Sequence, residues 1–308
     1  MNKLRTFSAI LVLCAFALTA AGQQTQPGTQ PAKQPDKPVS YNYLLPWAGK
    51  GPHVAHTAEA EAKAPFQIFD NVYYVGPLSA STYIIKTDQG LILIDPTLEY
   101  VTDLVLEHIR AVGLNPKDIK YILISHGHWD HTAGVAAMQK ATGAKVAMAA
   151  GDWDVYEAPD PNNTFQRIPR DMIMKDGDVI ELGNTTIQLY VTPGHTTGCL
   201  TMVYTVYDHG KPYKAMTLGG TGYNMPPGYT KKFIESFQRM RAIPDVTVLL
   251  PDHPEINDIF ALEKKLQMRK PGEPNPFVIG RAAVLSWFDA VIKGAQEVDR
   301  LKTLAKQE

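Results

Sequence analysis

Three histidines and an aspartate fall within six consecutive positions of the chain, at His126, His128, Asp130 and His131. They directly follow the apolar run 122–124, which is typical of a buried strand, so they lie on a loop at a strand end, where protein scaffolds present functional groups. Zn²⁺ binds imidazole nitrogen and carboxylate oxygen, whereas packing these polar groups beside a core without a metal is costly. The cluster therefore predicts a metal site, and it constrains the fold more than any other feature of the sequence.

The spacing within this cluster also indicates how the ligands are shared. In an extended backbone, side chains two positions apart point to the same side. His126, His128 and Asp130 are therefore expected on one side of the loop, and His131 on the other. One short loop can in this way serve two neighbouring metal ions, which together activate a water molecule near neutral pH.

Runs with strand and helix periodicity alternate along the chain from about residue 41. Strands are expected at 72–75, 82–85, 91–94, 121–124, 145–148, 186–191, 201–206, 215–218 and 246–250. Helices are expected at 100–112, 135–141, 229–241 and 281–304. Because these elements come in two successive batches, the sequence predicts an α/β fold with two sheets packed face to face and helices outside, a four-layer αβ/βα sandwich.

The N-terminus has the features of an export signal. Lys3 and Arg5 precede an apolar run from about residue 7 to residue 21, which ends in small residues before Gln23. The run is shorter than the roughly 20 apolar residues of a membrane span. Residues 1–22 are therefore predicted to be a signal peptide, and the protein is expected to be exported, either periplasmic or secreted. An uncleaved membrane anchor is the alternative.

The remainder of the chain is expected to be a linker and one domain. Residues 23–40 are rich in Gln and Pro and are predicted to be a disordered linker, followed by a folded domain over 41–308. Removal of the signal peptide would take Cys14 away and leave Cys199 with no disulfide partner. No stretch after residue 22 is apolar enough for stable membrane insertion.

The charge balance limits the expected partners. The formal net charge is -1, which gives no basic face for nucleic acid. A small-molecule substrate is the expected partner. The sequence leaves the oligomeric state open.

The motif His126-x-His128-x-Asp130-His131 resembles the metal-binding motif of the metallo-β-lactamase superfamily. Residues 192–198 (TPGHTTG) and 249–254 (LLPDHP) resemble the two later segments that complete the metal sites of that superfamily. The resemblance covers about residues 65–290 and implies the metallo-β-lactamase fold with two zinc ions per chain. It implies a first zinc site formed by His126, His128 and His195, and a second formed by Asp130, His131 and His253.

What the chain lacks between these motifs indicates the subclass that it resembles. Many relatives carry a metal-bridging aspartate, and the most common β-lactamase subclass carries a cysteine, where this chain has residues 217–222 (TLGGTG). A histidine-rich second site with neither residue is similar to the third subclass of class B β-lactamases. The segments 64–72 and 227–229 also look like that subclass.

The chain departs from that subclass in two places. The subclass usually has a serine-rich segment that helps to hold the substrate carboxylate, where this chain has residues 219–224. Thr221, Tyr223 and Asn224 are predicted to bind the substrate in its place. The disulfide that often lies near the C-terminus of the subclass cannot form here.

The resemblance implies a reaction. A metal-bound hydroxide is expected to attack the amide carbonyl of a β-lactam ring, with Asp130 as the catalytic residue that orients the hydroxide. One alternative is a di-zinc hydrolase of another small lactone, ester or amide, because the fold alone does not fix the substrate. A zinc-binding protein without turnover is the other alternative.

Overall fold

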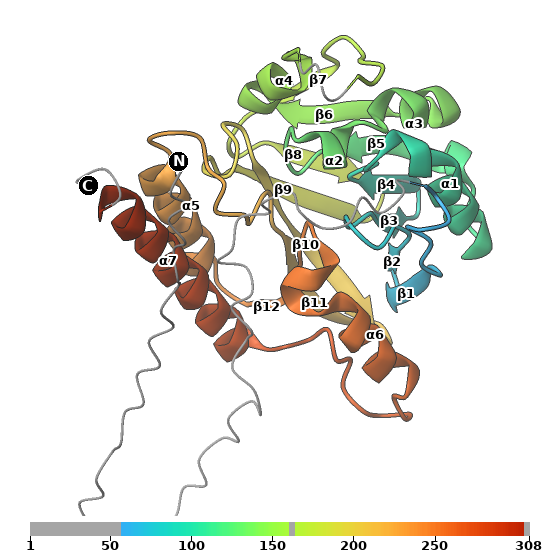
Figure 1. The fold of residues 1–308 in the computed structure, drawn as a ribbon. Coiled ribbons are helices and arrows are strands. Elements are labelled where there is room, and N and C mark those ends of the chain that lie inside the picture. Colours follow the sequence, from blue (N-terminus) through green and yellow to red (C-terminus); the bar gives the residue numbers. More distant parts are fainter. Residues whose placement is uncertain (1–56, 160–163, 305–308) are drawn as a thin grey trace, which may run out of the picture. The chain divides into compact units, whose positions relative to one another are not determined.

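The computed structural model describes residues 57–159 and 164–304. The predicted signal peptide, the predicted linker and the start of the predicted domain, up to residue 56, lie outside the described residues. Within the described part, two β-sheets pack face to face and helices lie against their outer faces (Figure 1). No helix of this part combines the length and the hydropathy that crossing a membrane requires.

The first sheet has seven strands in the order β1-β2-β3-β4-β5-β6-β7, antiparallel up to β4 and parallel from β4 to β7. Its strands are β1 (Phe66–Phe69), β2 (Val72–Tyr74), β3 (Tyr83–Thr87), β4 (Gly90–Ile94), β5 (Ile119–Leu123), β6 (Lys145–Ala149) and β7 (Met172–Met174). The second sheet has five strands in the order β12-β11-β10-β9-β8. Its strands are β8 (Val179–Leu182), β9 (Thr185–Val191), β10 (Leu200–Asp208), β11 (Lys211–Thr217) and β12 (Val246–Leu250).

Helices cover both outer faces. The first sheet is covered by α1 (Thr102–Ala111), α3 (Val135–Thr142) and α4 (Ala150–Glu157), and the second by α5 (Thr230–Ala242) and α7 (Arg281–Leu304). The remaining helices are α2 (Trp129–Thr132), α6 (Ile259–Gln267) and the short 3-10 turns η2 (Glu99–Val101), η3 (Pro116–Asp118) and η4 (Pro254–Asn257). The predicted four-layer αβ/βα sandwich is therefore confirmed.

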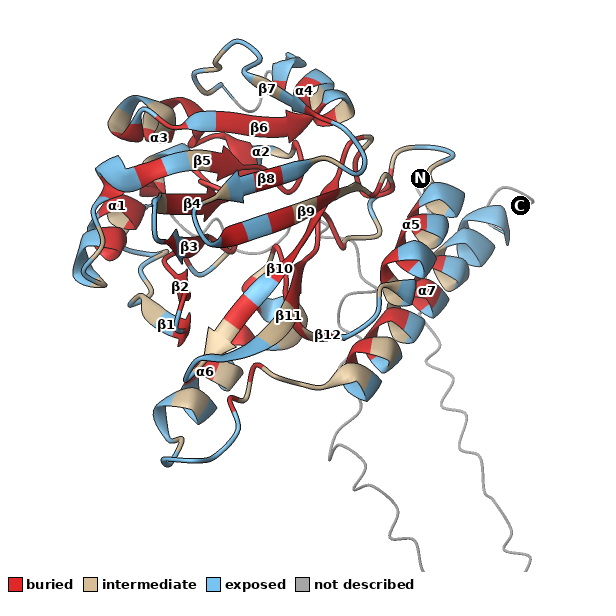
Figure 2. Ribbon diagram, turned by 180° about the vertical axis from the view of Figure 1, so that it is seen from behind, coloured by how far each residue is buried: buried red, intermediate tan, exposed pale blue. Residues whose placement is uncertain are grey.

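Strands of the first sheet are apolar on both faces because each face meets a different layer. Ile85, Ile92 and Ile94 point into the core between the two sheets, whereas Ile84 and Leu93 point into the core beneath the helices. All five are buried, and Figure 2 shows the inner strands as almost continuously buried. Burying a side chain of this size stabilises the fold by about 1.5–3 kcal/mol. Because both faces of these strands are buried, their sequences are continuously apolar and do not alternate with polar residues.

Six helices and strands were not predicted from the sequence, namely β1, β7, β8, α2, α4 and α6. Three of them are strands of three or four residues, too short for a periodic pattern to stand out. In α4 the two large buried side chains are Trp153 and Tyr156, which do not amount to a helical stripe. Tertiary contacts, more than local pattern, decide these elements.

Strand direction brings several loops to one edge of the sandwich. In the first sheet, β4 and β5 run parallel. In the second, β11 and β12 run parallel, and β9 runs the same way because both β9 and β11 are antiparallel to β10. The segments that follow the carboxyl ends of these strands carry the residues of the candidate site.

Candidate metal centre

One group of three histidines consists of His126 and His128, from the loop after β5, and His195, from the loop between β9 and β10. One nitrogen from each lies within 4.8 Å of the others. The ring centroids are 4.9 Å apart for His126–His128, 4.7 Å for His126–His195 and 4.5 Å for His128–His195. Nε2 of His126 is buried and has no hydrogen-bond partner among the described residues. A buried unpaired nitrogen is what a metal ion would satisfy, so this group fits an ion.

A second group brings Asp130 and His131 together with His253, which follows β12. The Nε2 atoms of His131 and His253 are 3.2 Å apart. Oδ2 of Asp130 lies 3.6 Å from the first and 3.5 Å from the second. A tetrahedral ion with bonds of 2.0–2.1 Å separates its ligand atoms by about 3.3 Å. The three spacings therefore match one face of a zinc coordination tetrahedron.

The backbone beyond His128 is not extended, and this corrects the predicted orientation of the later ligands. His128 is extended, with φ -67° and ψ 152°, but α2 begins at Trp129. The amides of His131 and Thr132 donate to the carbonyl of His128. These bonds form because no neighbouring strand pairs with the chain here, so the backbone donors are satisfied locally. Alternation holds for His126 and His128, and a helical turn aims Asp130 and His131 at the second group.

Partners on the far side of the rings fix which nitrogen faces the centre. Nδ1 of His195 donates to the carbonyl of Gly222 at 2.9 Å, and Nδ1 of His253 donates to the carbonyl of Ser79 at 2.7 Å. Nδ1 of His131 donates to the Asp95 carboxylate at 3.0 Å. Because a carbonyl or carboxylate can only accept, each ring keeps Nε2 for the centre, as metal-ligating histidines do.

Glycines make room for these rings. Gly220 has φ 70°, a left-handed conformation, and a Cβ at this position would lie 2.6 Å from a ring carbon of His195. A Cβ on Gly127 would lie 2.8 Å from the Asp152 carbonyl oxygen and 2.9 Å from Cβ of Val155. The first glycine lets the loop after β11 pass His195, and the second lets α4 pack directly on the histidine loop.

The two groups differ in protonation in the metal-free protein. Burial, reinforced by neighbouring imidazoles, lowers the pKa of His195 to about 3 and holds that of His126 well below its ordinary value. Both are therefore neutral, which is the metal-binding form. Burial also disfavours charge on His131, but the carboxylates of Asp130 and Asp95 outweigh it and raise its pKa to about 9. Burial would raise the pKa of Asp130, and the imidazoles of His131 and His253 hold it low.

Asp95 connects β4 to both groups of ligands. It is buried, with φ 55°, and its Oδ1 accepts a hydrogen bond from the Ser125 amide at 2.7 Å. Its Oδ2 accepts from the Ser125 hydroxyl and from Nδ1 of His131. The Ser125 hydroxyl also lies 3.2 Å from Nδ1 of His126. One carboxylate thus positions the start of the histidine loop and the ring of His131.

Asp152, at the start of α4, ties the histidine loop to the His195 loop. It is fully buried and accepts hydrogen bonds from the Gly198 amide and the Thr196 hydroxyl, both at 3.0 Å. Burial raises the pKa of Asp152 to about 7, although these bonds and one from the Gly127 backbone oppose the rise. The side chain therefore holds the two loops together.

The raised pKa of Asp152 makes a prediction for stability. Between about pH 4 and pH 7 the unfolded chain ionises this carboxyl while the folded protein keeps it protonated, so the free energy of unfolding falls as the pH rises, by at most about 1.4 kcal/mol per pH unit. Asp152→Asn is expected to remove this fall. Denaturant unfolding of both metal-free proteins at pH 4, 5.5, 7 and 8 measures it. An unchanged pH dependence in the variant would contradict the assignment.

The three predicted substrate-binding residues have different surroundings. Thr221 is buried, and its hydroxyl donates to Oδ1 of Asp252 at 3.1 Å. The Tyr223 hydroxyl donates to the carbonyl of Val291 in α7 at 3.0 Å. Both hydroxyls are thus directed at other parts of the protein, which weakens their predicted role. Asn224 is exposed, and its Oδ1 lies beside Gly222, whose carbonyl holds His195. Substrate binding by Thr221, Tyr223 and Asn224 stays a prediction.

The centre is open to solvent on one side. The side chains of Asp130 and His253 are 28% and 25% exposed, whereas the side chain of His131 is fully buried. Trp129, between the ligands in sequence, is 40% exposed. A substrate can therefore approach from the side of Asp130, His253 and Trp129.

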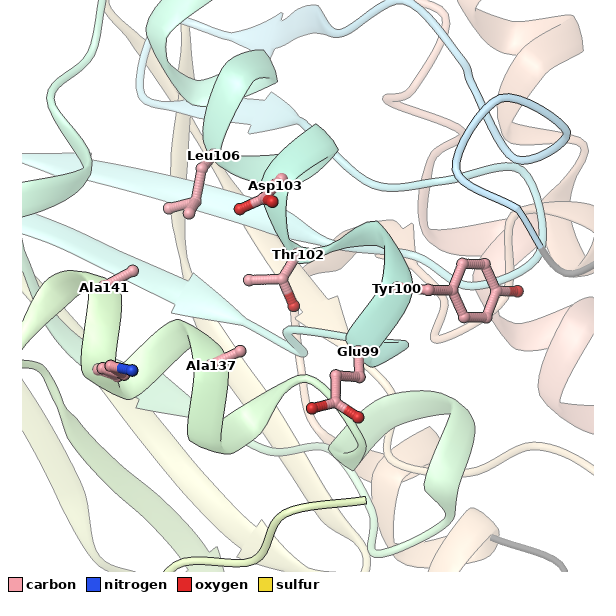
Figure 3. Close-up of a pocket in the computed structure, with 8 residues that line it drawn as sticks. Glu99, Tyr100, Thr102, Asp103, Leu106, Ala137 and Ala141 are labelled. Carbon is pink, nitrogen blue, oxygen red and sulfur yellow. The ribbon is translucent and has the colours of Figure 1, made fainter. Parts of the chain in front are cut away.

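A surface cavity of ≈ 450 Å³ lies elsewhere, between η2, α1 and α3 (Figure 3). Glu99, Thr102 and Leu106 line one wall, and Ala137 and Ala141 line the other. It contains no residue of either ligand group. We therefore assign the chemistry to the histidine cluster.

The sequence interpretation missed three acids around this centre. Asp95 follows the apolar strand 91–94 in the same way that the histidine loop follows its strand, and that pattern was available as a signal. Asp252 lies within a segment already singled out for His253. Nothing in the sequence around Asp152 marks it, because its partners are 44 and 46 positions away.

Comparison with known proteins gives relatives for most of the described chain. The sequence profile of the metallo-β-lactamase superfamily matches residues 75–209. The structure is similar to a subclass B3 metallo-β-lactamase of Bradyrhizobium japonicum, with 30% sequence identity and a TM-score of 0.71 over 80% of this chain and 96% of that one. It is also similar to a metallo-β-lactamase of Legionella gormanii, with 29% identity and a TM-score of 0.71 over 79% and 98% of the two chains.

Sequence comparison with curated proteins gives relatives that include hydroxyacylglutathione hydrolases. A hydroxyacylglutathione hydrolase of Cereibacter sphaeroides is 31% identical over 133 residues, which are 43% of this chain and 47% of that protein. A hydroxyacylglutathione hydrolase of Ectopseudomonas mendocina is 31% identical over 171 residues, 54% and 58% of the two chains. The chain thus spans about half the length of the curated relatives that it matches.

Proposed function

The chain belongs to the metallo-β-lactamase superfamily, and from this premise we propose that it is a di-zinc hydrolase that opens the amide bond of β-lactam rings. One observation carries the choice of substrate. The structural similarity to a subclass B3 metallo-β-lactamase extends over 96% of that chain at 30% sequence identity. The chain also has no acid between Asp208 and Glu235, the stretch that contains the end of β11.

The residues present fit two zinc ions. His126, His128 and His195 would hold one ion, and Asp130, His131 and His253 would hold the other, because imidazole and carboxylate are the donors that zinc prefers. When bound, the ions lower the pKa of a water molecule and polarise the substrate carbonyl.

The chain's own residues then position the reactants. Asp130 accepts a hydrogen bond from the attacking water at the solvent-facing side of the centre, orients it and relays its proton toward the leaving nitrogen. Asn224, at the rim beside Gly222, is placed to bind a polar group of the substrate. No serine or cysteine nucleophile takes part. Cys199 is buried beside Thr196, and burial raises the pKa of its thiol.

The cellular setting follows from the N-terminal sequence. Lys3, Arg5 and the apolar run after them support export, and we propose a periplasmic or secreted enzyme that acts on a small molecule. A second candidate is hydrolysis of a glutathione thioester, which the sequence similarity to hydroxyacylglutathione hydrolases favours.

Turnover assays separate these candidates. Zinc-loaded protein is expected to hydrolyse a chromogenic cephalosporin, a penicillin or a carbapenem, to fall to background after chelation and to recover when zinc is added. Serine-directed acylating inhibitors should have no effect. Folded, zinc-loaded protein that cleaves an acylglutathione thioester but no β-lactam would establish the second candidate. If it cleaves neither substrate, a zinc-binding protein without turnover becomes the better description.

A further inference from the structure

Asp252 is a buried acid to which neither the sequence motifs nor the two groups of ligands assign a role. It lies two residues beyond the end of β12 and is 2% exposed. Its Oδ1 accepts the hydrogen bond of the Thr221 hydroxyl. Its Oδ2 is buried and has no hydrogen-bond partner among the described residues. A carboxylate oxygen left in this condition is costly unless a positive charge lies beside it.

Lysine and arginine do not supply that charge. In residues 57–159 and 164–304, the ion pairs of these side chains are made with other acids. The basic groups near Asp252 are histidines. Nδ1 of His126 lies 3.9 Å from Oδ2, which is too far for a hydrogen bond, and His131 and His253 lie within 4.8 Å of the carboxylate without a hydrogen bond to Oδ2.

The position of Asp252 relative to His131 and His253 indicates the source of the positive charge that its free oxygen requires. A carboxylate oxygen of Asp252 lies within 4.8 Å of ligand atoms of both His131 and His253, whose Nε2 atoms are 3.2 Å apart. Asp130 reaches the same two rings with a side chain that is 28% exposed, whereas the Asp252 side chain is 1% exposed. The two histidines therefore have one acid on their solvent side and a second within the protein.

Strand register explains why the acid comes from this segment. Thr217 at the end of β11 pairs with Leu250 at the end of parallel β12. Two residues further on, the chain has Gly219 after β11 and Asp252 after β12. The loop after β11 offers no carboxylate, and the loop after β12 offers one at the same level of the sheet.

We propose that Oδ2 of Asp252 is a further oxygen ligand of the metal ion that His131 and His253 hold. The inference rests on the proposed di-zinc centre and adds a ligand to it. Thr221 then serves as a positioning residue that holds the other oxygen of the same carboxylate.

Zinc titration of the full-length protein, without any turnover assay, tests this assignment. Asp252→Asn keeps the shape and the acceptor for Thr221 but replaces Oδ2 with an amide nitrogen that cannot bind metal. It is expected to weaken one of the two zinc ions at least about tenfold. Variants His195→Ala and His253→Ala identify which ion is affected, and the ion weakened by Asp252→Asn should be the one weakened by His253→Ala. Glu263→Gln, which replaces a buried acid of α6 that pairs with Lys63 and belongs to neither ligand group, is the matched control and should leave both affinities within about threefold of the wild type.

Thermal unfolding gives a second readout. Zinc should raise the melting temperature of Asp252→Asn less than that of the wild type, each compared with its own metal-free form, because the variant binds the ion less tightly. Asp252→Ser, which leaves space for water, should show the same zinc dependence if the asparagine variant does not fold.

Three outcomes would overturn the assignment. They are unchanged affinity for both ions, weakening confined to the ion that His195→Ala weakens, and an equal rise in melting temperature with zinc. Wild-type protein that binds no zinc would instead refute the proposed function itself.

Discussion

Asp130→Ala is expected to lower kcat by about 10²–10⁴-fold, the range for loss of a positioned proton-transfer group. The carboxylate lies 3.5 and 3.6 Å from the Nε2 atoms of His253 and His131 and is on the solvent side of the centre. In the proposed mechanism, its removal takes away both a ligand atom of the second group and the acceptor that orients the attacking water. Steady-state kinetics at saturating zinc, with the zinc content measured on the same sample, gives the result.

Asn224→Ala is the matched comparison for Asp130→Ala. Asn224 is exposed beside the centre and belongs to neither group of ligands. Its replacement should raise KM several-fold with little change in kcat, because it removes binding and leaves the transition state alone. If Asp130→Ala retained kcat within about threefold of the wild type while binding two zinc ions, its catalytic role would be wrong.

Asp95→Ala is expected to have the largest effect on stability, a loss of about 3–5 kcal/mol in the free energy of unfolding. The carboxylate is buried and accepts hydrogen bonds from the Ser125 amide, the Ser125 hydroxyl and Nδ1 of His131. Alanine leaves the Ser125 amide and Nδ1 of His131 buried with no acceptor, and the Ser125 hydroxyl keeps only its contact with Nδ1 of His126; each unpaired donor is costly. Urea unfolding of the metal-free proteins at neutral pH measures the difference.

Asp95→Asn separates loss of shape from loss of charge. Asparagine keeps an acceptor for the Ser125 amide but cannot stabilise a charged His131, whose pKa of about 9 depends partly on Asp95. Its destabilisation at neutral pH should therefore be smaller than that of the alanine variant and should diminish above about pH 9, where His131 is neutral in the wild type as well. A loss under about 1 kcal/mol in Asp95→Ala would show that this carboxylate does not hold the loop.

The sequence determined the local chemistry of the centre. His126, His128, Asp130 and His131 lie within six positions after a buried strand, so their proximity follows from chain connectivity in any fold. The long helix expected at 281–304 and the two-sheet architecture also followed from the sequence, because apolar periodicity reports which face of an element is buried. His195 and His253 were found through resemblance to a family, since nothing in the spacing of the chain brings them to the first four residues.

Only the tertiary structure decided how that chemistry is supported. Asp95 reaches His131 from β4 across 36 positions, and Asp252 reaches the same region from β12 through strand register. Asp152 ties two loops together from a helix that no periodic pattern revealed. The same holds for the hydroxyls of Thr221 and Tyr223, whose partners lie 31 and 68 positions away. Such contacts depend on sheet packing and on the close approach of loops, and a linear pattern records local periodicity but not which distant segments meet.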